Sequence, residues 1–121
     1  MTIVYASLIV NILVAGFWGV VLAFTPRVSF RLWPYGSDNP GNRILASLYL
    51  TITVLSVFAV IQVDQSVQLC IFLFVFQILY KVMTAITVRD FKNPVVLSNL
   101  AIAVLHSFSL NRLLQYVQEQ R

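Results

Sequence analysis

Four long apolar stretches, separated by short polar breaks, occupy most of the chain. None of them contains Asp or Glu, and Lys81 is the one full charge well inside a stretch. A helix of about 20 apolar residues, rising about 1.5 Å per residue, matches the roughly 30 Å hydrocarbon core of a bilayer. The sequence therefore predicts four transmembrane helices, in the ranges Ile3–Phe24, Ile44–Ile61, Val67–Val88 and Val95–Leu114.

The composition supports the same class. Of the 121 residues, 60% are hydrophobic and 10% are charged, a balance typical of integral membrane proteins. The spans take up about 80 residues, so the breaks between them are too short to build a core of their own. We expect an all-α polytopic membrane protein, a four-transmembrane-helix bundle in a single domain over residues 1–121.

Two Asn-Pro pairs mark the starts of predicted helices. Asn39-Pro40 precedes the second apolar stretch, and Asn93-Pro94 precedes the fourth. Asparagine is a favoured N-cap, and proline fits the first helical position because the N–H that it lacks would have no partner there. Short breaks at residues 62–66 and 89–93 predict that the third stretch is the antiparallel neighbour of both the second and the fourth.

The basic residues predict an orientation. Loop 25–43 carries three arginines and loop 89–93 carries an arginine and a lysine, whereas the opposite side has Arg112 and Arg121. Because Lys and Arg favour the cytoplasmic side, we expect a multi-pass protein of the cell (inner) membrane with cytoplasmic basic loops and both termini outside. The first basic residue, Arg27, follows the first apolar stretch, which therefore predicts a retained helix and not a signal peptide.

The same basic residues predict partners. They flank apolar spans and form no basic run, so the net charge of +4 indicates contact with membrane lipids and not with nucleic acid. The predicted starts of the second and fourth helices add the positive end of a helix dipole to this face. The candidate contacts for anionic lipid are Arg27, Arg31, Arg43, Arg89 and Lys92. Protein partners would be a second copy of the chain or a larger membrane complex.

Polar residues recur at helical spacing inside the apolar stretches. Those of the third stretch lie three or four residues apart: Gln77, Tyr80, Lys81, Thr84 and Thr87. Asn99 and His106 are seven apart in the fourth stretch, and the second contains Ser47 and Thr51. Because lipid offers no hydrogen-bond partner, such side chains are expected to face inward. The candidate intramembrane polar pocket consists of Asn11, Gln77, Lys81, Asn99 and His106.

Depth divides these residues into two predicted layers. At about 1.5 Å per residue, Asn11, Gln77 and His106 lie near the bilayer midplane, whereas Lys81 and Asn99 lie nearer the cytoplasmic face, together with Ser47 and Thr51. In one interpretation they join helices by hydrogen bonds worth about 0.6–2 kcal/mol each, and the lysine extends to the headgroups. In the other, they line a functional pocket or a proton path. The sequence leaves both open.

Several chemistries lack the residues that they require. Proton-coupled export by the four-helix small multidrug transporters, which have a similar length, needs a carboxylate inside the first span, and no span here has one. Cys70 is the single cysteine, and no His pair has ligand spacing, which excludes thiol, haem and metal catalysis by known motifs. No glycine-rich phosphate loop is present. We therefore expect no cofactor and no enzymatic activity.

In architecture, the whole chain resembles the small four-helix DoxX-like membrane proteins. The resemblance rests on the four spans, the loop after the first of them, and the start of the second helix, NPGNRILASLYL, although the usual glycine-rich start is absent. It implies a quinone- or redox-linked accessory role.

Three functions follow as hypotheses. The first is a non-enzymatic accessory or structural membrane subunit, which needs only an apolar helical face. The alternative is a small transporter or lipophile-binding bundle that uses the polar intramembrane residues. The third, an enzyme acting on a lipid, is disfavoured because the spans contain no acid/base pair.

Overall fold

The computed structural model describes residues 1–24 and 39–121, and these form four helices long and apolar enough to cross a membrane, with no strand. The first span is continuous but changes its winding: α1 (Thr2–Val10) passes into a π-helical segment, η1 (Asn11–Ala15), and then into α2 (Gly16–Phe24). The predicted all-α four-helix membrane fold is confirmed. The other elements are α4 (Pro40–Ile61), the short 3-10 helix η2 (Val63–Gln65), α5 (Val67–Val88) and α6 (Pro94–Glu119).

The helix ends follow the predicted capping signals. The Asn39 side chain accepts a hydrogen bond of 2.9 Å from the Asn42 amide, and Asn93 accepts one of 2.9 Å from Val95. Each cap precedes a proline in the first turn, so α4 begins before the apolar stretch that predicted it. The end of α5 is set by Arg89, whose φ of 56° is left-handed, a conformation that ends helices. At the other end of the last span, α6 continues past the apolar stretch to Glu119.

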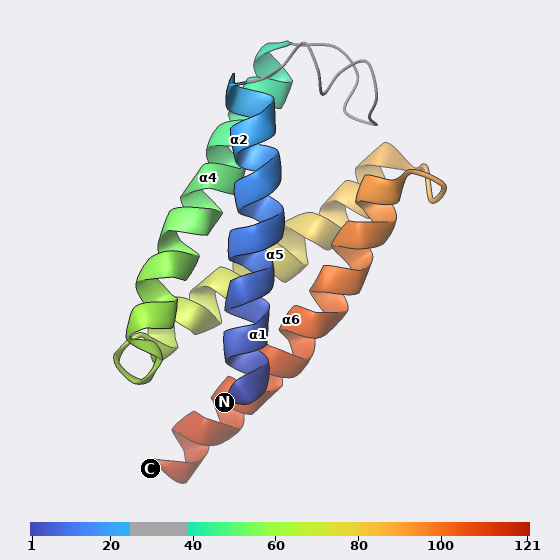
Figure 1. The fold of residues 1–121 in the computed structure, drawn as a ribbon. Coiled ribbons are helices and arrows are strands. Elements are labelled where there is room, and N and C mark those ends of the chain that lie inside the picture. Colours follow the sequence, from blue (N-terminus) through green and yellow to red (C-terminus); the bar gives the residue numbers. More distant parts are fainter. Residues whose placement is uncertain (25–38) are drawn as a thin grey trace.

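The helices associate as two pairs. The first span packs chiefly along α4, and α5 packs chiefly along α6, while α1 also touches α6. Figure 1 shows both termini at the same end of the bundle as the α4–α5 connection, and the α5–α6 turn at the opposite end. The predicted neighbours α4 and α5 are in contact near their connection and diverge along the rest of their lengths. A short connection fixes where two helices meet but not the angle between them.

The two ends of the bundle are packed differently. At the end that holds the termini, all four spans contribute to one buried cluster: Val4, Leu8, Ala59, Val63, Cys70, Leu73, Phe74 and Leu113. Toward the other end, a smaller cluster has all its buried residues on α2 and α4, namely Leu22, Ala46 and Tyr49, and only the partly buried Tyr80 of the described α5–α6 pair packs against it. The two helix pairs therefore share a core at one end and leave space between them toward the other. Large apolar side chains such as Leu13, Phe24 and Phe72 face outward, as lipid contact requires.

Candidate functional site

A hydrogen-bonded group of polar side chains joins the four spans near their middle. His106 Nε2 of α6 lies 2.9 Å from Asn11 Oδ1 and 3.3 Å from Gln77 Oε1 of α5. Asn11 Nδ2 donates to Ser56 Oγ of α4 at 3.1 Å. Since His106 Nε2 meets two amide oxygens, it carries the proton and donates to them. The midplane residues predicted to share one depth are thus in direct contact.

The same network leaves two buried nitrogen atoms without a partner among the described residues. They are His106 Nδ1 and Gln77 Nε2, on side chains that are 0% and 1% exposed. The imidazole stacks on Phe74, with ring centroids 4.9 Å apart, so its Nδ1 side is packed within the protein. Gln77 differs, because it also lines a cavity between the helices.

A second bonded pair lies closer to the end with the packed core. Ser7 Oγ of α1 and Ser109 Oγ of α6 are 2.6 Å apart, and Ser109 also donates to the carbonyl of Ile3 at 3.0 Å. Both serines are fully buried. These bonds satisfy both hydroxyl groups and fasten α1 to α6, which accounts for them as helix-packing contacts.

Lys81 extends inward from α5. Its ammonium donates to Asn99 Oδ1 of α6 at 3.0 Å and lies 5.0 Å from the centre of the Tyr80 ring. The side chain is 5% exposed, and no carboxylate of the described residues pairs with it. The alternative in which this lysine extends to the headgroups is therefore not the arrangement found. Asn99 Nδ2 is buried and has no partner among the described residues.

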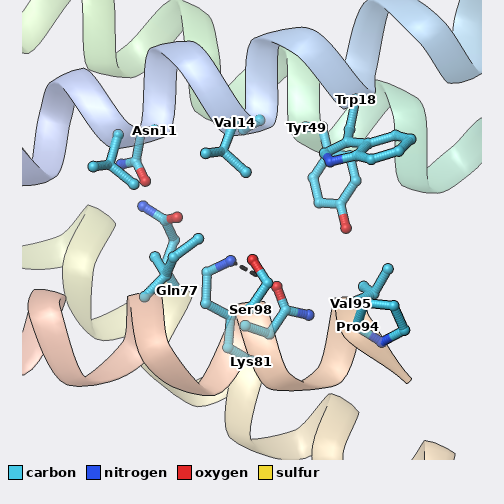
Figure 2. A pocket seen from close by; sticks show the side chains of 13 residues that line it. Asn11, Val14, Trp18, Tyr49, Gln77, Lys81, Pro94, Val95 and Ser98 are labelled. Carbon is cyan, nitrogen blue, oxygen red and sulfur yellow. Dashed lines mark hydrogen bonds between the residues drawn. The ribbon is translucent and has the colours of Figure 1, made fainter. Parts of the chain in front are cut away.

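A cavity of about 220 Å³ lies between the two helix pairs. Figure 2 shows Asn11, Val14 and Trp18 of the first span facing Gln77 and Lys81 of α5 across it. The first span lines it largely through the π-helical segment, an irregularity that is frequent at functional sites. Among the described residues, the lining consists of Val10, Asn11, Val14, Ala15, Trp18, Tyr49, Gln77, Lys81, Pro94, Val95, Ser98, Asn99 and Ile102.

The five predicted pocket residues are all buried, but only four of them line the cavity. Asn11, Gln77, Lys81 and Asn99 line the cavity, whereas His106 lies behind Gln77 and outside the lining. Sequence reasoning missed Trp18 and Tyr49, which supply aromatic walls. Trp18 follows Asn11 by seven residues and so shares its helix face, a signal that was available in the spacing.

The prediction that Ser47 and Thr51 face inward is wrong. Both are exposed on α4, where Ser47 Oγ donates to the Arg43 carbonyl at 3.1 Å and Thr51 Oγ1 to the Ser47 carbonyl at 2.9 Å. The predicted inward face of α5 likewise ends early, because Thr87 is exposed and donates to the carbonyl of Met83. A hydroxyl that bonds the carbonyl four residues before it needs no partner on another helix.

The candidate lipid contacts gather in part at one end. Arg43, Arg89 and Lys92 are exposed and belong to the end of the bundle that carries the α5–α6 turn. Arg27 and Arg31 lie outside the described residues. At the opposite end, Arg112 forms an ion pair of 3.6 Å with Glu119. Of the described basic side chains near the ends of the spans, three thus lie at the end toward which the cavity extends and two, Arg112 and Arg121, at the other.

No family model matches the chain, and neither a curated protein nor a solved structure does. The resemblance to DoxX-like proteins therefore stays a prediction from architecture, and the function has to be argued from the geometry of the cavity.

Proposed function

We propose that this protein is a small, non-enzymatic, multi-pass membrane protein that binds a lipophilic small molecule between its two helix pairs. The observation that carries the proposal is a cavity with mostly apolar and aromatic walls and a few convergent polar groups, the usual composition of a ligand site. Two of those groups, Gln77 Nε2 and Asn99 Nδ2, are buried donors without partners among the described residues.

These two unpaired donors argue against a purely structural role for the polar residues that line the cavity. A buried polar group without a partner costs about 1–3 kcal/mol, so helix packing alone does not account for retaining two of them beside a cavity. The serine pair Ser7 and Ser109 and the Asn11–Ser56 bond are the opposite case, because they join helices and need no ligand. These bonds favour the second candidate function, an accessory or structural subunit.

Transport is less well supported than binding. The cavity extends from the midplane network toward the end with the α5–α6 turn, and the packed cluster around Leu8 and Phe74 occupies the other end. A transporter needs access to its site from both sides in turn, and this arrangement offers a path on one side. Binding is the function that requires no further change in the helices.

Filling the cavity tests the proposal. Val14 lines it, whereas the adjacent Leu13 is 65% exposed on the lipid side of the same span. We expect Val14→Phe to reduce the hydrophobic small molecules that co-purify with the protein in mild detergent by at least about tenfold, because the added ring occupies the site. Quantitative mass spectrometry of the bound lipophiles measures this. Leu13→Phe adds a ring facing lipid and should match the wild type; equal retention by both variants would contradict ligand binding in the cavity.

We further propose that the protein lies in the cell (inner) membrane with its basic loops in the cytoplasm and both termini outside. The placement of Arg43, Arg89 and Lys92 at one end supports this orientation. A reporter that is active only outside the cytoplasm should be active when fused after Arg121 and inactive when fused after Arg89. A reporter that works only in the cytoplasm should give the reverse pattern, and cytoplasmic activity after Arg121 would refute the orientation.

A further inference from the structure

We propose that the cavity recognises the carboxylate of a single-chain amphiphile, such as a fatty acid, through Lys81 Nζ, Asn99 Nδ2 and Gln77 Nε2. This inference rests on the proposed function, since it names the class of ligand for the same site. The three groups come from two helices, α5 and α6, that pack along each other on one side of the cavity. Figure 2 shows the ends of Lys81 and Gln77 directed into the space in front of the first span.

Three donors lie close together at this side of the cavity: the Lys81 ammonium and the amide nitrogens of Asn99 and Gln77, which have no partner among the described residues. An ammonium group has no acceptor, so the contact of Lys81 Nζ with Asn99 fixes the amide oxygen on the lysine side and leaves Nδ2 free to donate. Gln77 likewise turns its amide oxygen toward His106 Nε2, which leaves its own Nε2 without a partner among the described residues. A ligand that satisfies these groups has to bring acceptors, and a carboxylate brings two oxygen atoms with about four lone-pair sites.

The charge of Lys81 indicates that the ligand is an anion. Lys81 is 5% exposed, and the hydrogen bond that its ammonium donates to Asn99 goes to a neutral amide. No Asp or Glu occurs in any of the four apolar stretches, and no carboxylate of the described residues pairs with this lysine. A buried ammonium is stable only when it is paired or neutralised, so a bound anion supplies the missing counter-charge. A cationic ligand would instead add repulsion, and a neutral one would leave the lysine unpaired.

The size of the cavity and the single charge of Lys81 favour a ligand with one alkyl chain and a small head group. The cavity of about 220 Å³ is smaller than the roughly 300–1,000 Å³ of sites that enclose drug-sized ligands, so a two-chain phospholipid does not fit. Lys81 balances one negative charge, as a carboxylate requires, and not the two of a phosphate monoester. The apolar walls beyond the head group, which include Val14, Trp18 and Ile102, suit an alkyl chain.

Three probes that share a chain and differ in head group test the inference. Decanoate, decanol and decyltrimethylammonium are titrated into the purified full-length protein in a neutral detergent, and binding is followed by calorimetry. We expect decanoate to bind at least about tenfold more tightly than either of the others, because its hydrogen bonds are assisted by charge. Lys81→Met should remove this preference, Lys81→Arg should keep most of it, and Lys92→Met, which alters an exposed lysine outside the cavity, should leave it unchanged.

The outcomes separate the two proposals. Equal binding of the three probes, with all of it lost in Val14→Phe, would overturn the carboxylate inference and leave lipophile binding in place. If none of the probes binds, and Val14→Phe retains as much co-purified lipophile as the wild type, the proposed function fails as well. Should Lys81→Met not fold, as judged by helical circular dichroism, the comparison of probes on the wild-type protein still decides. A folded Lys81→Met protein that keeps the tenfold preference would refute the role of the lysine.

Discussion

Replacing Gly19 with alanine is expected to cost about 1–3 kcal/mol of unfolding free energy, because it forces α2 away from α4. An alanine Cβ at this position would lie 2.9 Å from Leu50 Cδ2 and 3.2 Å from the backbone nitrogen of Leu50. The leucine side chain can rotate, but the backbone atom can move only with its helix. The buried cluster of Leu22, Ala46 and Tyr49 depends on the same approach. Unfolding by increasing fractions of dodecyl sulfate in mixed micelles measures the loss.

Gly16 provides the matched control on the same helix. A Cβ there would lie 3.3 Å from Thr53 Cγ2 and 3.5 Å from Thr53 Oγ1, which are side-chain atoms of a half-buried residue. We expect Gly16→Ala to change the free energy of unfolding by no more than about 0.5–1 kcal/mol, with a gain from reduced backbone freedom offsetting the tighter contact. Equal losses at the two glycines would show that Gly19 is not the point of closest approach.

The fold was predictable because membrane spans are defined by length and polarity alone. Four apolar stretches and two Asn-Pro caps identified the helices and most of their ends. What the sequence could not supply was the pairing. The five-residue connection between α4 and α5 predicted neighbours, yet α4 packs chiefly along the first span. Which helices pack along each other depends on how closely their surfaces fit at contacts such as that between Gly19 and Leu50. The periodicity of apolar residues carries no information about this fit.

The polar residues were predictable to different degrees. Helical spacing and depth brought Asn11, Gln77 and His106 together, because amides and imidazole in a span have to find partners on other helices. The same rule failed for Ser47 and Thr51, whose hydroxyls reach carbonyls of their own helix. The spacing indicated four of the residues that line the cavity, but its size and apolar walls have no sequence signal, since they result from two helix pairs that share a core at one end.

The substitution His106→Leu is expected to destabilise the protein by about 2 kcal/mol and to weaken the binding of decanoate much less than Lys81→Met does. The imidazole is fully buried, stacks on Phe74 and donates to both Asn11 and Gln77, so its loss leaves two amide oxygens unsatisfied. That effect lies at the upper end of the roughly 0.6–2 kcal/mol measured for hydrogen bonds between membrane helices. Because His106 does not line the cavity, the ligand keeps Lys81 and Asn99, and the substitution acts on it only by releasing the Gln77 amide that His106 contacts.

A double-mutant cycle that combines His106→Leu with Asn11→Leu tests whether the two side chains stabilise the protein through the hydrogen bond that they share. If Asn11 and His106 act through their shared bond of 2.9 Å, the double variant should lose less unfolding free energy than the sum of the single variants, by about 1 kcal/mol. Thr51→Val is the control, because this exposed side chain bonds only its own helix and should cost no more than about 0.5 kcal/mol. A His106→Leu protein with wild-type stability and no affinity for decanoate would reverse the assignment: the imidazole would then belong to the binding site, and the network around Asn11 would not be what holds the four helices together.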